Sequence, residues 1–204
     1  DLIAPCHRPL YEEALNKEWS EWLRWEAVTM LSTIRSREIW VSPSEKRTII
    51  PTRIAYRNNH GGRDPVELRR LNLALIKAKA RLCLQGFRQQ GKHRLRKDSL
   101  ALSRSGFHIV CQVVASYHLE LCTGDMSSAF LQAGADPKEE NENDIYLSQP
   151  RNIFDKGTLP GMLPGQLLKL RGSAYCKVNA PRLWFRKVAG FLIKNQWKQL
   201  CQDM

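Results

Sequence analysis

The N-terminal part of the chain has apolar residues at helical spacing. Leu15, Trp19, Trp22 and Leu23 recur at i, i+4, i+7 and i+8, with glutamates between them. Residues three and four apart share one face of a helix, so this pattern predicts an amphipathic helix over residues 10–32. The tryptophan stripe is typical of a helix face that packs against a core.

Two strands are predicted next. Residues 47–56 are rich in β-branched side chains, and Pro51 among them favours an edge strand or a bulge. The sequence Asn-Asn-His-Gly-Gly at residues 58–62 is typical of a turn. A second strand over residues 78–87 is expected to return antiparallel to the first.

The second half of the chain predicts two more helices and two short strands. Residues 107–118 place apolar side chains on one helical face, and residues 181–192 form a basic amphipathic pattern that starts with proline. We expect residues 119–124 to be a short buried strand and residues 145–147 a short returning strand. Glycine and proline mark residues 157–165 as a loop.

Positive charge is concentrated in one segment. The chain has 32 Lys and Arg against 20 Asp and Glu, a net charge of +12. Residues 46–104 hold 16 of the bases and 3 of the acids, so the whole excess lies there. Such a segment is typical of a surface that meets nucleic-acid phosphates. The alternatives are a solvated basic face and a nuclear-import patch.

Composition favours a globular domain in a reducing, intracellular compartment. The six cysteines have no zinc-site spacing and mostly lie among apolar residues, so buried free thiols are expected. No run approaches the roughly 18 apolar residues of a membrane helix, and the N-terminus does not look like a signal peptide. We therefore expect no membrane partner. A first residue other than Met fits a fragment or a processed polyprotein.

An acidic residue and an aromatic residue follow the predicted buried strand. Residues 121–131 read Leu-Cys-Thr-Gly-Asp-Met-Ser-Ser-Ala-Phe-Leu. Nucleotidyl transfer needs Mg²⁺ ions held by converging carboxylates, and Asp125, leaving a strand, is placed to be one such ligand. The spacing alone also fits Asp125 as a helix N-cap and Phe130 as an ordinary core residue.

A pair of cations lies in the second predicted strand. Side chains alternate along a strand, so Lys79 and Arg81 are expected on the same face. An ammonium and a planar guanidinium together suit a triphosphate. The alternative is two solvated charges on a half-buried strand.

Four motifs of the chain resemble motifs that occur in the same order in the reverse transcriptases of copia-type LTR retrotransposons. The resemblance covers about residues 10–200, and Ala-Pro-Arg-x-Trp is specific by itself. A weaker match, at residues 96–104, precedes the palm strand. The four motifs are Lys-Ala-Arg-Leu-Cys-Leu-Gln-Gly-Phe at 79–87, Asp-Met-Ser-Ser-Ala-Phe-Leu at 125–131, Ile-Tyr-Leu-Ser-Gln-Pro at 145–150, and Ala-Tyr-Cys-Lys-Val-Asn-Ala-Pro-Arg-Leu-Trp-Phe at 174–185.

This resemblance implies an α+β fold of the right-hand polymerase type. One partial reverse transcriptase domain would span residues 1–204. Residues 10–104 would be the N-terminal helix and fingers, and residues 105–204 the first half of the palm, including the helix after the Ala-Pro-Arg motif. Asp125 would be the catalytic residue and Mg²⁺ ligand.

The resemblance also implies the nucleotide contacts. Lys79 and Arg81 would bind the phosphates of a dNTP, and Phe130 would be the steric gate that excludes a ribose 2′-hydroxyl. A second set of residues would lie near the template or the nucleotide: Tyr175, Asn179, Pro181 and Arg182. The partners would be an RNA or DNA template-primer and the remaining Pol segments, such as integrase and RNase H, in the cytoplasm or a virus-like particle.

Two departures from the family pattern change the expected activity. The chain ends at Met204 before a Tyr-x-Asp-Asp motif, so we expect it to be inactive as a polymerase alone. Cys176 stands where the family has glycine and is expected to crowd the site, whereas Asn179 for glutamine is a mild change. The alternatives are a dead relic that acts at most as a basic nucleic-acid-binding module, and a pseudogene product that folds poorly.

Overall fold

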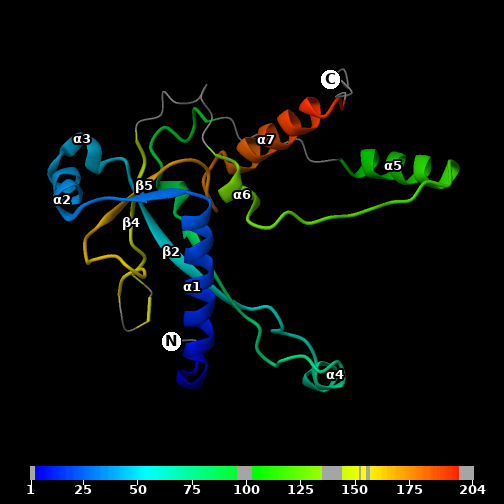
Figure 1. Cartoon of the computed structure of the whole chain (residues 1–204), viewed down its shortest axis with the longest axis horizontal. Coiled ribbons are helices and arrows are strands. Elements are labelled where there is room, and N and C mark those ends of the chain that lie inside the picture. The colour runs from blue at the N-terminus through cyan, green and yellow to red at the C-terminus, as the bar shows by residue number, and fades with distance from the viewer. Residues whose placement is uncertain (1–2, 96–102, 135–143, 152, 155–156, 198–204) are drawn as a thin grey trace.

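The computed structural model describes residues 3–95, 103–134, 144–151, 153–154 and 157–197, and its architecture is α+β (Figure 1). The helices are α1 (Arg8–Arg24), α2 (Thr33–Val41), α3 (Pro43–Lys46), α4 (Pro65–Arg70), α5 (Arg104–Ser116), α6 (Ala129–Gln132) and α7 (Ala180–Lys194), with 3-10 turns η1 (Pro5–His7) and η2 (Gly86–Arg88). The strands are β1 (Val28–Met30), β2 (Ile49–Asn58), β3 (Ala78–Leu84), β4 (Tyr146–Ser148) and β5 (Leu167–Leu170). Among the described residues, none of the helices is long and apolar enough to cross a membrane.

A five-stranded mixed sheet organises the fold, in the order β1-β5-β4-β2-β3. The parallel pair is β2 with β4, and the other pairs are antiparallel. The prediction that Pro51 marks an edge strand is wrong, because β2 lies between β4 and β3. Pro51 is the last residue of β2 in register with β4, and from Thr52 onward β2 pairs with β3 instead. The proline therefore stands where the strand changes neighbours.

The predicted antiparallel pair of strands is confirmed. Thr52–Asn58 pairs with Ala78–Leu84, and the pair extends away from the rest of the sheet towards α4 (Figure 1). The predicted turn after β2 is held by Asn58, whose Oδ1 accepts hydrogen bonds from the backbone N–H of His60 (3.0 Å) and of Lys77 (2.9 Å). We call the paired segments of β2 and β3 the ribbon.

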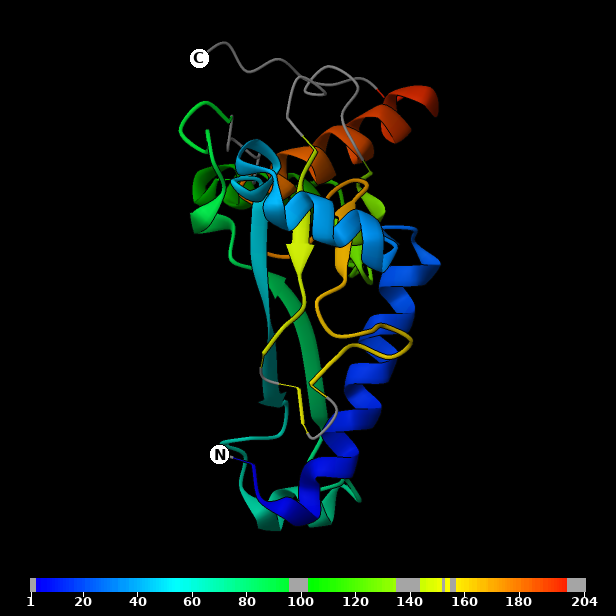
Figure 2. The same cartoon turned by 90° about the vertical axis from the view of Figure 1, so that its left-hand side faces the viewer.

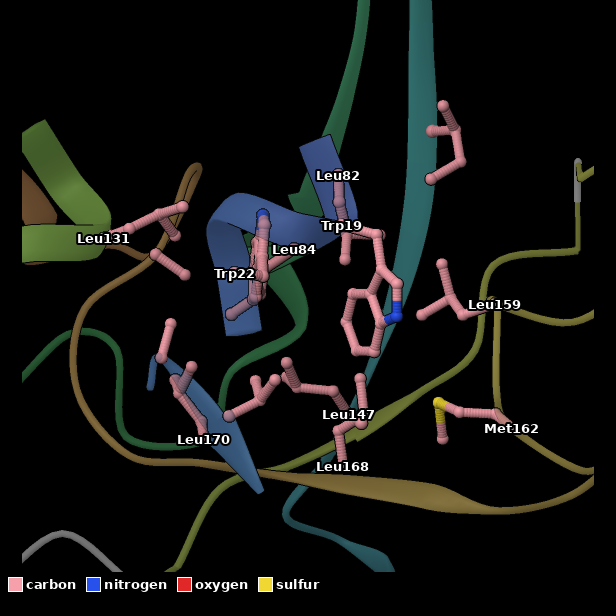
Figure 3. Packing of buried hydrophobic residues seen from close by; sticks show 14 of the residues in the cluster. Trp19, Trp22, Leu82, Leu84, Leu131, Leu147, Leu159, Met162, Leu168 and Leu170 are labelled. Carbon is pink, nitrogen blue, oxygen red and sulfur yellow. The ribbon is translucent and has the colours of Figure 1, made fainter. Parts of the chain in front are cut away.

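The core lies between α1 and the sheet. Figure 2 shows α1 running alongside β3, which is an edge strand of the sheet. Trp19 and Trp22 of α1 are 3% and 0% exposed, which confirms the predicted buried stripe, although Leu23 lies outside it. Figure 3 shows these two rings among side chains of the sheet and the 157–165 loop. The labelled neighbours are Leu82, Leu84, Leu131, Leu147, Leu159, Met162, Leu168 and Leu170.

Helix α1 ends earlier than its sequence pattern predicts. Its last turn closes with two backbone hydrogen bonds, from Glu26 N–H to the Leu23 carbonyl and from Ala27 N–H to the Trp22 carbonyl, each 3.0 Å. Glu26 adopts a left-handed conformation with φ 48°, so this is a Schellman motif without its usual glycine. The chain then turns into β1, which pairs with β5.

Predictions for the second half are mixed. The helix at 181–192, the strand at 145–147 and the loop at 157–165 are confirmed. The buried strand at 119–124 is wrong, because these residues form an exposed, irregular segment. The helix predicted at 107–118 exists as α5, but it projects from the body and none of its residues is buried (Figure 1). A strand forms only where a neighbour takes up its backbone groups, and the described strands pair without this segment.

Candidate nucleotide and nucleic-acid interface

One face of the ribbon carries four cations. Residues opposite each other on paired strands project to the same face, and the register sets Arg57 opposite Lys79 and Arg53 opposite Cys83. Arg81, two residues from each of these β3 positions, shares that face, which confirms the predicted alignment of Lys79 with Arg81. The intervening residues Thr52, Ile54, Ala80 and Leu82 are buried, whereas Arg53, Arg57, Lys79 and Arg81 are exposed.

Two of these cations lie directly opposite each other on the paired strands. Like charges directly opposite each other destabilise a pair of strands, and Arg57 and Lys79 form such a pair. A run of phosphates along the ribbon would offset that repulsion and contact cations from both strands. Sequence reasoning singled out only Lys79 and Arg81. The alternation of Arg53 and Arg57 with Thr52 and Ile54 was the signal that could have added the other two.

Three residues from three separate motifs meet at one end of the cationic face. The Arg81 guanidinium lies over the Tyr175 ring, with its carbon 4.6 Å from the ring centroid. The Phe130 and Tyr175 rings pack edge to face, 6.0 Å between centroids at 78°. A backbone hydrogen bond of 3.1 Å from Leu84 N–H to the Tyr175 carbonyl fixes this loop to the end of β3. A guanidinium stacked on an aromatic ring is held in place while its N–H groups stay available for an anion.

Helix α1 supports this group with a carboxylate. Glu21 Oε2 accepts hydrogen bonds from Ser128 Oγ (3.2 Å) and Trp25 Nε1 (3.1 Å). Ser128 directly precedes α6, which carries Phe130. Burial acts to raise the pKa of Glu21, but these hydrogen bonds outweigh it and lower the pKa below its ordinary value. Burial also raises the pKa of the Tyr175 hydroxyl, so it stays neutral and able to donate.

A second carboxylate of α1 accepts a hydrogen bond at the outer edge of the ribbon. Glu18 Oε1 accepts from the backbone N–H of Leu82 (3.0 Å) and from Trp22 Nε1 (3.1 Å). Leu82 belongs to the outer strand, and this N–H has no strand beside it. Burial raises the pKa of Glu18, while the two hydrogen bonds and the positive charges of Arg81 and Lys79 partly oppose that rise. Sequence reasoning missed Glu18 and Glu21, which carried no signal beyond their place on an amphipathic helix.

Asp125 does not lie where the sequence placed it. It is exposed on an irregular segment, with no strand leading to it. It is not a helix cap either, because α6 starts at Ala129 and its N-cap is Ser128. Within the described part of the chain, no group of three or more His, Cys, Asp and Glu side chains could hold a metal ion.

The residues around the start of α7 are half-buried or buried. Pro181 lies in the first turn of the helix, as predicted, and Arg182 follows it with intermediate exposure. Asn179 occupies the N-cap position and is 1% exposed, so its side chain lies inside the protein. Helix α7 packs against α6, and Lys187 Nζ donates to the carbonyl of Gln132. The start of α7 is thus tied to the element that carries Phe130.

Cys176 has a backbone conformation that favours glycine. Its φ is 66°, in the left-handed region that residues other than glycine rarely adopt. Its carbonyl approaches Gly86 so closely that a Cβ added to Gly86 would lie 2.1 Å from that oxygen. The backbone is therefore strained at Cys176, while the crowding of the site by its side chain stays a prediction. The cysteine prediction is wrong for Cys6, Cys122 and Cys176, which are exposed, although all described cysteines are free.

Comparisons with known proteins give one informative match. The chain is similar to the retrovirus-related Pol polyprotein from transposon RE1 of Arabidopsis thaliana, with 28% identity over 121 residues. The match covers 59% of this chain and 8% of that polyprotein, so the chain spans a small part of its relative. No protein-family model and no solved structure matches. The similarity supports an origin of the chain in a retrotransposon Pol polyprotein.

Proposed function

We propose that this chain is a fingers-and-palm piece of a copia-type reverse transcriptase, which binds a template-primer and the triphosphate of a dNTP. The observation that carries the proposal is the meeting of Arg81, Tyr175 and Phe130 beside the cationic face of the ribbon. These residues come from three motifs that are separated in the sequence. Their assembly next to four exposed cations favours a site for a phosphorylated aromatic ligand over scattered solvated charges.

Each residue has a physical role in the proposed complex. Arg81 and Lys79 contact the triphosphate, and Arg53 and Arg57 extend the contact along a nucleic-acid backbone. Tyr175 holds the Arg81 guanidinium, and Glu21 of α1 accepts a hydrogen bond from Ser128, which precedes the helix that carries Phe130. Phe130 packs against the Tyr175 ring and lies beside the sugar, where it would exclude a 2′-hydroxyl.

Binding rather than polymerisation is the activity proposed for the described residues. Asp125 is exposed and belongs to no metal-binding group in the part of the chain with described structure. Mg²⁺ and the catalytic step of the family are therefore not assigned to these residues. The same observation favours a second candidate, a non-catalytic nucleic-acid-binding relic, in which the cationic face binds nucleic acid but no dNTP is bound.

Two variants test the proposal. Arg81→Ala removes the stacked guanidinium, whereas Lys92→Ala removes a cation on an exposed turn where Nζ donates to the Phe87 carbonyl (2.6 Å). Dissociation constants for a dNTP and for a labelled template-primer would be measured by equilibrium binding. We expect Arg81→Ala to weaken dNTP binding about tenfold, corresponding to ~1.4 kcal/mol, and Lys92→Ala to change only the salt dependence of nucleic-acid binding.

The results separate the two candidates. Binding of dNTP that depends on Arg81 supports the reverse transcriptase piece. Nucleic-acid binding without measurable dNTP binding supports the relic. Equal effects of the two substitutions on dNTP binding would contradict the assignment of the ribbon as a nucleotide-binding fingers element.

A further inference from the structure

Two thiols from distant parts of the chain meet beside Arg81. Cys83 lies in β3 and is 5% exposed, while Cys176 lies in the loop before α7 and is exposed. Burial and, after it, the neighbouring Cys176 thiol raise the pKa of Cys83, so the two side chains lie close to each other. No other pair among the described cysteines has a recorded contact of this kind.

The backbone holds these two segments together independently of the thiols. The hydrogen bond from Leu84 N–H to the Tyr175 carbonyl involves the residues next to the two cysteines. On the other side, the Cys176 carbonyl lies against Gly86 with no room for a side chain there. A disulfide joins residues whose Cα atoms lie about 4.4–6.8 Å apart, and only backbones in direct contact reach that range.

We propose that Cys83 and Cys176 are a redox modification site that forms a reversible disulfide under a peroxide-class oxidant. The cross-link joins the Tyr175 loop to the ribbon next to Arg81. This inference rests on the thiol geometry and does not depend on the proposed function.

The reaction balances with one peroxide molecule. The Cys176 thiolate attacks one peroxide oxygen, which gives a sulfenic acid and a hydroxide that takes up the thiol proton as water. The Cys83 sulfur then attacks the sulfenic sulfur, the S–S bond forms, and the hydroxyl group leaves with the Cys83 proton as a second water. Two thiols are oxidised and the peroxide is reduced to two waters.

The exposure of each thiol decides which of the two reacts with the oxidant. Cys176 is exposed to a dissolved oxidant, so it reacts first. Burial raises the pKa of Cys83 to about 12, which keeps it a thiol and protects it from direct oxidation. Arg81 and Arg53 oppose that rise and face the sulfur, where they favour the thiolate that develops during its attack.

The cross-link has a measurable consequence for stability. It closes a loop of about ninety residues, and a loop of this length restricts the unfolded chain strongly. The oxidised chain is therefore expected to have a higher midpoint of thermal unfolding, which a thiol reductant reverses. The Tyr175 ring also becomes fixed relative to Arg81, at the end of the cationic face.

The test uses the full chain treated with hydrogen peroxide, then blocked with an alkylating reagent and mapped by mass spectrometry without reduction. We expect one linked peptide pair containing Cys83 and Cys176, lost after reduction and absent in Cys176→Ser. Cys122→Ser is the matched control, because Cys122 is also exposed but has no recorded thiol neighbour among the described residues. It should leave the link unchanged.

Two outcomes would overturn the proposal. One is Cys176 oxidised to sulfinic or sulfonic acid while Cys83 remains free for alkylation after denaturation. The other is a disulfide that pairs either residue with a different cysteine, or that persists in Cys176→Ser. Because Cys176 is on the surface, its serine variant is expected to fold, so the result does not depend on a substitution of buried Cys83.

Discussion

Replacing Glu18 tests how α1 holds the edge of the ribbon. One carboxylate oxygen accepts hydrogen bonds from Leu82 N–H and Trp22 Nε1. Glu18→Ala leaves both donors without an acceptor, at about 1–3 kcal/mol for each buried group. Glu18→Gln keeps a carbonyl oxygen for both donors and removes the charge. We expect Glu18→Ala to be less stable than Glu18→Gln by about 2–6 kcal/mol.

The assay is thermal unfolding at neutral pH, with urea unfolding as a second measure. For a chain of this size, about 2–4 °C corresponds to each kcal/mol, so the midpoints of the two variants should differ by about 4–24 °C. Glu18→Gln should be at least as stable as the wild type, because burial disfavours the charged carboxylate. Equal midpoints for the two variants would refute the edge-capping role of Glu18.

The difference in stability between the wild type and Glu18→Gln should depend on pH. The pKa of Glu18 is raised in the folded state, so its contribution to stability is fully present below its unfolded pKa and is lost as pH rises through the folded value. The stability of the wild type relative to Glu18→Gln should therefore increase as pH falls from neutral towards 4.5, the ordinary value for a glutamate. A constant difference across that range would contradict the assigned shift.

Two other predictions follow from the same region. Cys176→Gly should raise the free energy of unfolding by about 0.5–1 kcal/mol. A left-handed conformation costs residues other than glycine about 1–2 kcal/mol, and the larger entropy of glycine in the unfolded chain offsets about 0.5–1 kcal/mol of the gain. Cys122→Gly, which lies outside helices and strands and has no positive φ, is the control, and a destabilised Cys176→Gly would contradict the strain. Arg57→Glu should stabilise the ribbon by about 0.2–1 kcal/mol opposite Lys79 and weaken template-primer binding with a shallower salt dependence. Calorimetry and binding titrations check these, and unchanged nucleic-acid affinity in Arg57→Glu would contradict the cationic face as the binding surface.

Local sequence signals predicted the elements whose contacts are local. The ribbon follows from the β-branched residues of β2 and the turn at Asn58, and α7 follows from Pro181 and a helical apolar pattern. The end of α1 was not predictable from its apolar spacing, because the pattern continues past Trp25. What ends the helix is a left-handed glutamate, Glu26, and the pairing of the next residues with a strand far along the chain.

Only some residues of the candidate site could likewise be predicted from the sequence. Arg81, Tyr175 and Phe130 were found through motif resemblance, and alternation alone would give the shared face of Lys79 and Arg81. The supporting carboxylates were not found, because a glutamate on an amphipathic helix has no local mark of a distant hydrogen-bond partner. The apolar run before Asp125 looked like a buried strand, but burial requires a neighbour that an apolar run does not specify.

The pairing of the first strand with the last has a consequence for synthesis on the ribosome. β1 ends at Met30, yet its described partner, β5, is Leu167–Leu170. Until β5 has emerged, the nascent chain cannot close its sheet. The apolar residues of α1 then lack the β5 side chains that belong to the same core. Ribosome stalling or premature termination before residue 167 should therefore release chains that require chaperones, whereas pauses after residue 170 should be tolerated.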